Sequence, residues 1–247
     1  VEVRWREAID GYGVVNAAAV KLMLAAAMER LGGAGTPWQE WATPSARISI
    51  KVNTVTCQAF THPEVAGAVA DGLVKAGATP SAVTVWDRDS PTLIARGYSI
   101  DASGESAFRC IGSNMSDLTT AKNITVAGHA VKLSPLVEGS DVIVNIAALK
   151  DHSMAGVTLS LKNNFGMLIS SLDLHGNVVA GSGCEPGISD LAARPEIRDR
   201  LGLAMIDGLL GVCQGGPGPV DPAYVFRYAG LLVSRDPVAL DRRGLAI

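Results

Sequence analysis

The sequence is short of the features that mark membrane proteins and nucleic-acid-binding proteins. No uncharged apolar run reaches the roughly 18 residues of a membrane-spanning helix, and the longest helical candidate, residues 14–31, is interrupted by Asn16 and Lys21. Aromatic residues make up only 5% of the 247 residues, and the net charge is −3. Stacking platforms and a basic surface for phosphate backbones are therefore not expected. We expect a soluble chain with no transmembrane segment and no nucleic-acid partner.

Clustered cysteines are also missing. The four cysteines, Cys57, Cys110, Cys184 and Cys213, lie far apart in the sequence. Zinc and iron–sulfur sites use cysteines that are about two to four residues apart, so we expect no iron–sulfur cluster in this chain. Isolated buried thiols are favoured, and one long-range disulfide is left open because spacing does not reveal pairing.

The first residues carry no targeting signal. The chain begins "VEVRWREAID", without Met and without the basic and apolar regions of a signal peptide. Either a targeting segment was removed or the chain was cut. A cytoplasmic location and an exported, periplasmic location therefore both stay open.

The chain is instead rich in apolar residues with regular spacing. The hydrophobic fraction of 48% and the mean hydropathy of +0.25 suit a chain that buries a large core. Residues 14–31 have apolar residues at helical spacing and lead into a loop. We therefore divide the chain into an N-terminal helix and loop, residues 1–46, and a single α/β domain, residues 47–247.

Predicted strands and helices alternate in the second part. Strands are expected at 47–55, 82–90, 140–149, 202–212 and 228–236, and helices at 61–77, 93–100, 194–201 and from 236 onward. Thr61 and Glu64 have the spacing of a capping box. Residues 157–161 fit a strand or a helix, and we favour the helix.

This alternation predicts an α/β fold, in which a mostly parallel sheet is covered by helices on both faces. Short β-like pieces in residues 107–136 predict a small β-hairpin insertion, and residues 176–187 predict a Gly-rich loop.

Several predicted strands end in polar side chains. These are Lys51 and Asn53, Asp87 and Asp89, Lys150 to His152, Asp207, and Asp236. The carboxyl ends of parallel strands lie along one edge of the sheet, where open α/β folds bind ligands. We therefore expect a polar cleft at that edge, with the apolar neighbours of these residues filling the core beneath it.

Two of these pairs have alternative explanations. Lys51 and Asn53 lie on one face of their strand, where they could hold an anionic group or simply face solvent. Asp87 and Asp89 could bind a divalent cation or supply a base. Aspartate also starts turns and helices, so a helix-capping cluster is the alternative for this pair.

The stretch "NIAALKDHSMAGVTLSLKNNFG", residues 145–166, places Lys150, His152 and Lys162 among apolar residues. A histidine beside two lysines should lose affinity for its proton, and a neutral imidazole suits a general base or a metal ligand. Lysines in a cleft bind anions, or act as nucleophiles when desolvated. We predict these three residues as catalytic, with a surface loop as the alternative.

The remaining candidates are weaker. Asn163 and Asn164 could hold a ligand through their amides, although adjacent Asn residues also mark helix ends. The loop "GVCQGGPGPVDP" resembles a phosphate loop only in its glycines, because its prolines lack the donors that a phosphate nest needs. We expect a rigid loop at the cleft, with Gly216 as a ligand-binding candidate. His129 and His175 lie beside Gly in turns and receive no role.

Six motifs, taken in order, resemble the domain of unknown function 362 family. They are "ISIKVNTV", "THPEVAGAVADGLVKAGA", "VWDRDSPTLIARGY", "DVIVNIAALKDHSMAGVTLSLKNNFG", "IDGLLGVCQGGPGP" and "GLLVSRDPVALD". The resemblance covers residues 47–247, and K-x-H followed by "GVTLSLKNNFG" is its most specific part. The matching positions are Lys51, Asn53, Asp87, Lys150, His152, Lys162, Asn163, Gly216, Pro217, Asp236 and Asp241.

The resemblance implies an α/β domain without naming a reaction, because the family's activity is not established. Many members carry a ferredoxin-like segment that binds iron–sulfur clusters, and this chain lacks its clustered cysteines. The "VWDR…GY" motif is similar to a subgroup with twin-arginine export signals, which keeps export open.

Our leading hypothesis is an enzyme whose cleft binds a small anionic substrate or cofactor, with or without a divalent metal. Lys51, Lys150 and Lys162 would hold the anion, His152 would transfer a proton, and Asp87 would orient His152 or bind metal. The alternative is a non-catalytic carrier of a metal or organic cofactor that serves a redox partner protein. A structural subunit with an inactive cleft is a third reading. The sequence indicates neither the cofactor nor the oligomeric state.

Overall fold

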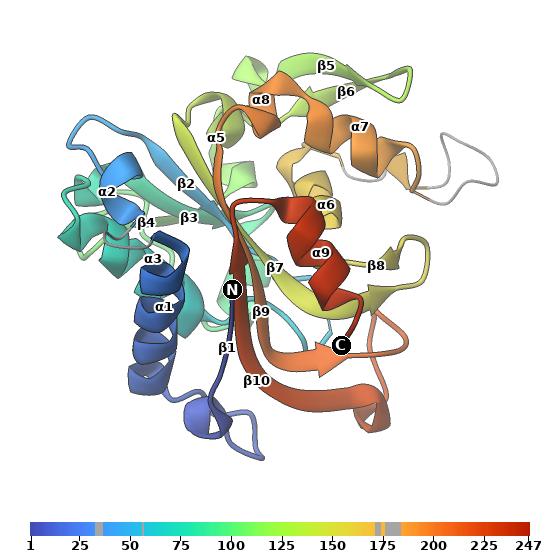
Figure 1. Cartoon of the computed structure of the whole chain (residues 1–247). Helices are drawn as coiled ribbons and strands as arrows, with labels where there is room; N and C mark the ends of the chain where they lie inside the picture. Colours follow the sequence, from blue (N-terminus) through green and yellow to red (C-terminus); the bar gives the residue numbers. More distant parts are fainter. Residues whose placement is uncertain (33–36, 56, 171–173, 176–183) are drawn as a thin grey trace.

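One mixed sheet runs through the computed structural model, which describes residues 1–32, 37–55, 57–170, 174–175 and 184–247 (Figure 1). Its strands, in order across the sheet, are β1 (Glu2–Arg4), β10 (Val225–Ser234), β9 (Leu201–Val212), β7 (Val142–His152), β2 (Ile48–Lys51), β3 (Val83–Asp87) and β4 (Arg109–Gly112). The short strand β8 (Gly156–Val157) pairs with β7.

The strands from β9 to β4 are parallel, and an antiparallel edge is added by β10 and β1. The predicted mostly parallel sheet is therefore confirmed. The strand predicted at 228–236 exists, but it runs antiparallel, so its end, Ser234, pairs with Ala204 near the start of β9. Asp236 consequently lies at the edge opposite the predicted cleft. There it caps α9 (Pro237–Gly244) by accepting from two backbone N–H groups, so its placement at the cleft was wrong.

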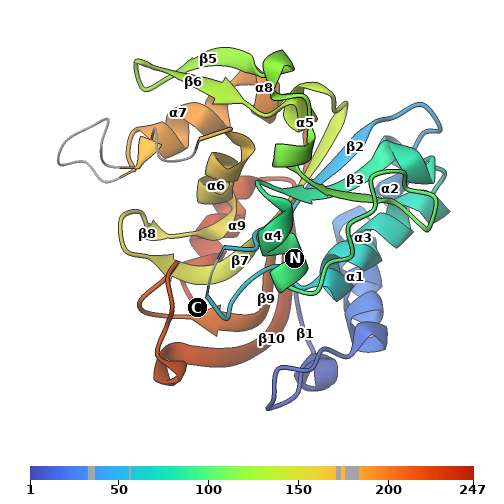
Figure 2. The same cartoon turned by 180° about the vertical axis from the view of Figure 1, so that it is seen from behind.

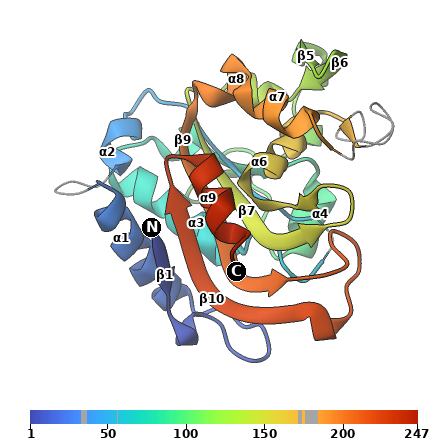
Figure 3. The same cartoon turned by 45° about the vertical axis from the view of Figure 1, so that its right-hand side comes forward.

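Helices cover both faces of the sheet, as predicted. On one face α1 (Ala17–Gly32) and α3 (Pro63–Lys75) pack over apolar side chains of β2, β3, β7, β9 and β10. On the other face lie α6 (Leu159–Asn163) and α9, with α5 (Pro135–Glu138), α7 (Gly187–Ala193) and α8 (Pro195–Arg198) beside them. Figure 3 shows α9 and α6 next to each other above β7 and β9.

The first 46 residues share the core of the remaining chain. They add the edge strand β1, which the sequence did not predict, and α1, whose Val20 and Met23 are buried in the same cluster as Val69 of α3. The short helix α2 (Trp38–Trp41) also packs against α3. The boundary between residues 46 and 47 stays a prediction.

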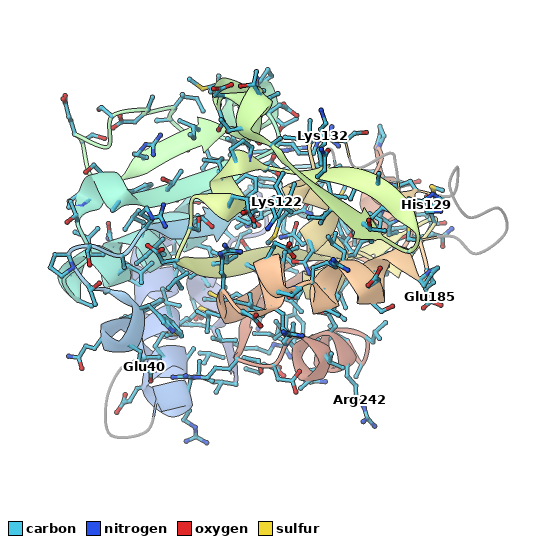
Figure 4. The ribbon with its side chains drawn as sticks, turned by 90° about the horizontal axis from the view of Figure 1, so that it is seen from above. Glu40, Lys122, His129, Lys132, Glu185 and Arg242 are labelled. Carbon is cyan, nitrogen blue, oxygen red and sulfur yellow. The ribbon has the colours of Figure 1, made fainter. Side chains whose placement is uncertain are left out.

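The predicted hairpin is present as β5 (Lys122–Val126) and β6 (His129–Leu133), a separate antiparallel sheet. Ala127 and Gly128 turn the chain with φ of 50° and 81°, which is the positive-φ pattern of a tight hairpin turn. Lys122, His129 and Lys132 lie along this hairpin (Figure 4). The hairpin is narrower than predicted, because residues 109–112 form β4 of the main sheet instead.

Other local predictions need correction. The N-cap of α3 is His62 rather than Thr61. The Thr61 hydroxyl instead donates to the carbonyl of Ile146 and accepts from the backbone N–H of Asn53, so the capping box is wrong. Asp207 lies inside β9 rather than at its end, and it accepts from the backbone N–H and Nδ1 of His62.

Two further predicted helices are present, with shifted bounds. The helix favoured at 157–161 is α6, which begins two residues later, and the helix expected at 93–100 is α4 (Ser90–Ala95). Most of the predicted Gly-rich loop at 176–187 lies outside the described residues. All four cysteines are described and are free. Among the described residues, no helix combines the length and the apolar character that crossing a bilayer requires.

Candidate functional site

A cavity of about 500 Å³ lies beyond the carboxyl ends of β2, β3 and β7. The predicted site residues that line it are Lys51, Asn53, Asp87, Asp89, Lys150, His152, Lys162 and Asn163. Figure 2 shows α4, α6 and the β7–β8 turn on this side of the molecule. The structure thus brings together residues from four distant segments. Two candidates, Asn164 and Gly216, are not part of the wall.

Lys51 and Asp87 form a buried ion pair at the base of the cavity. The Nζ of Lys51 donates to Oδ1 of Asp87 at 2.7 Å, and both side chains are at most 4% exposed. The other Asp87 oxygen accepts from the backbone N–H and hydroxyl of Thr54, each at 2.7 Å. Burial raises the pKa of Asp87, but Lys51 and Thr54 outweigh it and hold the pKa below its usual value. Lys51 therefore already neutralises an anion of the protein itself.

Gly166 explains how the turn after α6 can cover this pair. A Cβ at Gly166 would lie 2.6 Å from the Nζ of Lys51, which is closer than non-bonded atoms approach. A side chain at this position would therefore displace the Lys51 amine from its place beside Asp87, which favours glycine at the end of "LKNNFG".

Lys150 is fixed by three oxygen acceptors. Its Nζ donates to Oδ1 of Asn53 at 2.8 Å, to the carbonyl of Val55 at 3.0 Å and to the carbonyl of Ala59 at 3.2 Å. An ammonium has three N–H donors, so all of them are used. Burial lowers the pKa of Lys150. The role of Lys150 in this geometry is to hold the loop after β2 against the end of β7.

A chain of buried amides continues from Lys150 into α6. Asn53 donates through Nδ2 to Oδ1 of Asn163 at 3.0 Å, and Asn163 donates in turn to Oδ1 of Asn145 at 2.6 Å. Asn145 then donates to Oδ1 of Asn164 at 3.0 Å. The side chains of Asn163 and Asn164 therefore belong to this buried hydrogen-bond network. Sequence reasoning missed Asn145, although a fully buried Asn in the apolar strand "VIVNIAAL" was a visible signal.

The start of α6 is held by Asp241 from α9. The backbone N–H groups of Ser160 and Leu161 donate to the two oxygens of Asp241 at 2.7 and 2.8 Å. First-turn N–H groups have no partner within their own helix, so Asp241 caps α6 from a distant part of the chain. Burial raises the pKa of Asp241 to about 6, against the opposing effect of these two N–H donors. Asp241 thereby positions the helix that carries Lys162.

Lys162 differs from the other two lysines in its partners. Its Nζ lies 2.9 Å from Nε2 of His175 and 4.1 Å from the centroid of the Phe165 ring. Burial lowers its pKa to about 8, with help from the positive charges of Lys150 and Lys51. A substantial fraction of this amine is therefore neutral near pH 8.

His152 is neutral at physiological pH, and its environment also fixes its tautomer. Burial lowers its pKa to about 4, and the neighbouring Lys162, His175 and Lys150 act in the same direction. Nδ1 accepts from the backbone N–H groups of Met154 and Ala155 at 3.1 and 3.2 Å. Nδ1 is therefore unprotonated, and the proton of the neutral ring resides on Nε2. In this tautomer Nε2 is the donor of the ring and no ring nitrogen is free to accept a proton, in contrast to the general base considered from sequence.

His175 belongs to the same wall, although the sequence analysis gave it no role. Its ring stacks on His152 with centroids 5.5 Å apart and 23° between the planes. It meets Phe165 edge-on at 5.2 Å. Its neighbours in "LHGN" carry no pattern that points to a site, so only the fold could identify it.

The two remaining candidates have local structural roles. Asp89 lines the cavity and also caps α4, because its side chain accepts from the backbone N–H of Thr92 at 2.9 Å. Among the described residues, no group of three or more His, Cys, Asp or Glu side chains is placed to hold a metal ion. The metal site at Asp87 and Asp89 stays a prediction. Gly216 donates to Asp151 at 2.7 Å, which brings Pro217 to the cavity wall.

Comparisons with known proteins agree with this fold. The chain is 26% identical over 223 residues to the thylakoid-associated protein sll1697 of Synechocystis sp. The aligned region covers 87% of this chain and 65% of that protein. Among solved structures, the lactate racemase apoprotein from Thermoanaerobacterium thermosaccharolyticum superimposes with a TM-score of 0.53 and 15% identity, over 92% of this chain and 54% of the other. That likeness supports the α/β fold alone. Residues 48–246 match the family described as Domain of unknown function (DUF362), and the chain belongs to this family.

Proposed function

We propose that this chain is an enzyme that acts on a small anionic molecule in the cavity. The cavity is of the size that small-molecule sites have. The whole chain has a net charge of −3, but basic side chains outnumber carboxylates in the cavity wall. The wall contains four basic side chains, Lys51, Arg88, Lys150 and Lys162, and two carboxylates, Asp87 and Asp89. An excess of positive charge within low-dielectric walls attracts anions.

The proposal depends most on the contrast between Lys162 and the other two lysines. Lys51 donates to Asp87 and to the carbonyl of Val52, and Lys150 donates to three oxygen atoms, so both amines are held by oxygen acceptors of the protein. Lys162 contacts a histidine instead, and its pKa of about 8 lets it exchange a proton near neutral pH. We assign Lys162 as the reacting group. His152 then serves as donor to the ligand, and Asp87 holds Lys51 rather than orienting His152.

Binding of simple anions tests this proposal. Acetate, lactate and inorganic phosphate would be titrated calorimetrically into the wild-type chain, and lactate is included because a protein of similar fold is a lactate racemase. We expect Lys162→Met to weaken binding of at least one anion about tenfold or more, because it removes a charge that faces the ligand. Lys132→Met, on the exposed hairpin, is the matched control. Equal affinities in all three proteins would rule the site out.

A non-catalytic carrier of a metal or organic cofactor, serving a redox partner, is the second candidate. An organic group is favoured over a metal here, because the cavity is large and includes the apolar side chains of Val55, Met154 and Phe165. Native mass spectrometry and elemental analysis of the purified protein separate the two functions. A stoichiometric bound cofactor without turnover supports the carrier, whereas turnover of a small acid supports the enzyme.

A further inference from the structure

We propose that Lys162 forms an imine with the carbonyl group of an anionic aldehyde or 2-oxo acid, while Nε2–H of His152 binds the carbonyl oxygen. This proposal rests on the proposed function, because it names the substrate class and the bond that the same cavity would make. It is carried by the arrangement of Lys162, His152 and His175 around one cavity.

The three lysines of the cavity differ in the acceptors around their amines. Lys51 is paired with Asp87, and Lys150 donates to three oxygens. Lys162 is 7% exposed, lines the cavity, and has no carboxylate within ion-pairing distance among the described residues. Its nearest polar contact is Nε2 of His175 at 2.9 Å. Lys162 is thus the one of the three whose amine, among the described residues, has a ring nitrogen rather than oxygen atoms as its hydrogen-bond partner.

A nucleophilic amine must lose its proton before it can attack a carbonyl carbon. With a pKa of about 8, Lys162 has roughly two hundred times more neutral amine at pH 7.5 than a lysine at the usual value of 10.5. The groups that surround it are His152, His175, Lys51, Lys150 and Cys184. Burial, Lys150 and Lys51 disfavour the charged amine, whereas Cys184 and the face of the Phe165 ring, 4.1 Å away, favour it.

The fixed tautomer of His152 supplies the second requirement, a donor for the carbonyl oxygen. Backbone N–H groups of Met154 and Ala155 occupy Nδ1, so the opposite ring nitrogen carries the proton. A neutral imidazole that donates from a preorganised position polarises a carbonyl and stabilises the negative charge that develops on its oxygen. Because the backbone holds the ring, this donor needs no rearrangement when the ligand binds.

The reaction balances without any further reagent. The nitrogen of Lys162 forms a bond to the carbonyl carbon as the carbon–oxygen π bond breaks, and one amine proton moves to the oxygen. The oxygen then leaves as water with the second amine proton, and the carbon–nitrogen double bond forms. His175, in contact with Nζ, is placed to relay these protons. The excess of basic side chains in the wall selects carbonyl compounds that carry a negative charge.

Reductive trapping tests the proposal directly. The full chain is incubated with glyoxylate, the smallest aldehyde with a carboxylate, and then reduced with borohydride. We expect one adduct, with a mass gain equal to glyoxylate minus one oxygen atom, and peptide mapping should place it on Lys162. The adduct should form at least about tenfold faster than with uncharged acetaldehyde. Labelling should increase as the pH rises through about 8.

Two lysine-to-arginine variants control the experiment. Lys162→Arg keeps a positive charge but should lose the adduct, whereas Lys132→Arg, on the exposed hairpin, should be labelled as the wild type is (Figure 4). Adducts spread over surface lysines, and unchanged in Lys162→Arg, would overturn the imine. Wild-type peptide mapping decides this even if a variant folds poorly.

Calorimetry with glycolate, the hydroxy analogue of glyoxylate, separates this proposal from the function on which it rests. If glycolate binds the wild type and not Lys162→Met, yet no imine is trapped, the imine is wrong and the anion site stands. If neither glycolate nor glyoxylate binds, both proposals fail.

Discussion

The two faces of the central sheet bury different kinds of side chain. In β2, Ile48 and Ile50 point into the apolar core under α1 and α3, whereas Ser49 and Lys51 alternate with them on the opposite face. β7 repeats this pattern, with Val144 and Ile146 in that core and Asn145 turned toward α6. One face is stabilised by apolar contact area, and the other combines two apolar clusters with buried polar groups that need specific partners.

This difference predicts different responses to mutation. An apolar contact weakens in proportion to the atoms removed, but a buried polar network fails when one member leaves the others unpaired. The cavity lies beyond the carboxyl ends of the strands and is lined by buried polar residues, among them Lys51, Asp87 and Lys150. We therefore expect the buried polar residues of the cavity to affect stability and ligand chemistry together, and residues of the apolar core under α1 and α3 to affect stability alone.

The largest effect is expected from Asp87→Ala. This variant leaves the Lys51 ammonium buried without its counterion and the backbone N–H of Thr54 without its acceptor. Breaking one side of a buried ion pair lowers the free energy of unfolding by about 3–5 kcal/mol. Urea denaturation measures the loss. The matched control is Asp71→Ala, which breaks the exposed pair with Lys21 and should change stability by less than about 1 kcal/mol. Similar losses of unfolding free energy in both variants would contradict the distinction between the buried and the exposed ion pair.

A somewhat smaller loss is expected from Leu73→Ala on the apolar face. Leu73 of α3 is fully buried in the core beneath α1. The truncation should lower the free energy of unfolding by about 2–4 kcal/mol. In contrast to changes at the polar face, it should leave the reactivity of Lys162 toward glyoxylate unchanged while the protein is folded. Parallel loss of reactivity would show that the two faces are coupled.

Asp241→Asn should change how the free energy of unfolding depends on pH. The folded state raises the pKa of Asp241 from 3.8 to about 6, so between these values it binds more protons than the unfolded chain. Wild-type stability should therefore fall as pH rises from about 4 to about 6, by up to about 3 kcal/mol from this group. The variant should lack that decline. Urea denaturation at several pH values measures the difference between the two proteins.

His152 contributes a change of opposite sign that is present in both proteins. Its pKa falls to about 4 in the folded state, so its stabilising contribution is lost as pH drops from about 6.5 toward 4. Subtracting the variant curve from the wild-type curve removes this effect. A difference that is constant across pH would contradict the role given to Asp241.

The smallest effect is expected at Asp89. As the N-cap of α4 it should contribute about 1 kcal/mol, so Asp89→Ala should lower the free energy of unfolding by that amount. Thermal melts with and without Mn²⁺ test the metal prediction in the same experiment. Stabilisation by Mn²⁺ in the wild type that disappears in the variant would make Asp89 a metal ligand as well as a cap.

Much of the fold was predictable from local sequence patterns, because the apolar spacing that indicates a strand or an amphipathic helix involves residues close together in the chain. The cavity was predictable for the same reason, since parallel strands bring Lys51, Asp87 and Lys150 to one edge. The direction of a strand was harder to predict from the sequence. β10 has the same apolar pattern as a parallel strand, and only its pairing with β9 moves Asp236 to the other edge.

The roles within the site could not be read from the sequence. Three lysines looked equivalent, and their difference comes from which acceptors the fold places beside each amine. The tautomer of His152 depends on the backbone of the following turn. His175 required a stacking contact that no spacing rule describes.

The cap that Asp241 provides for α6 links two segments that are translated at different times. Ser160 precedes Asp241 by 81 residues, an interval that a ribosome covers in roughly 4–16 seconds. For nearly all of that interval the nascent chain contains Lys162 but lacks the carboxylate that caps its helix. We therefore expect this end of α6 to gain its cap only after α9 has been synthesised and has docked.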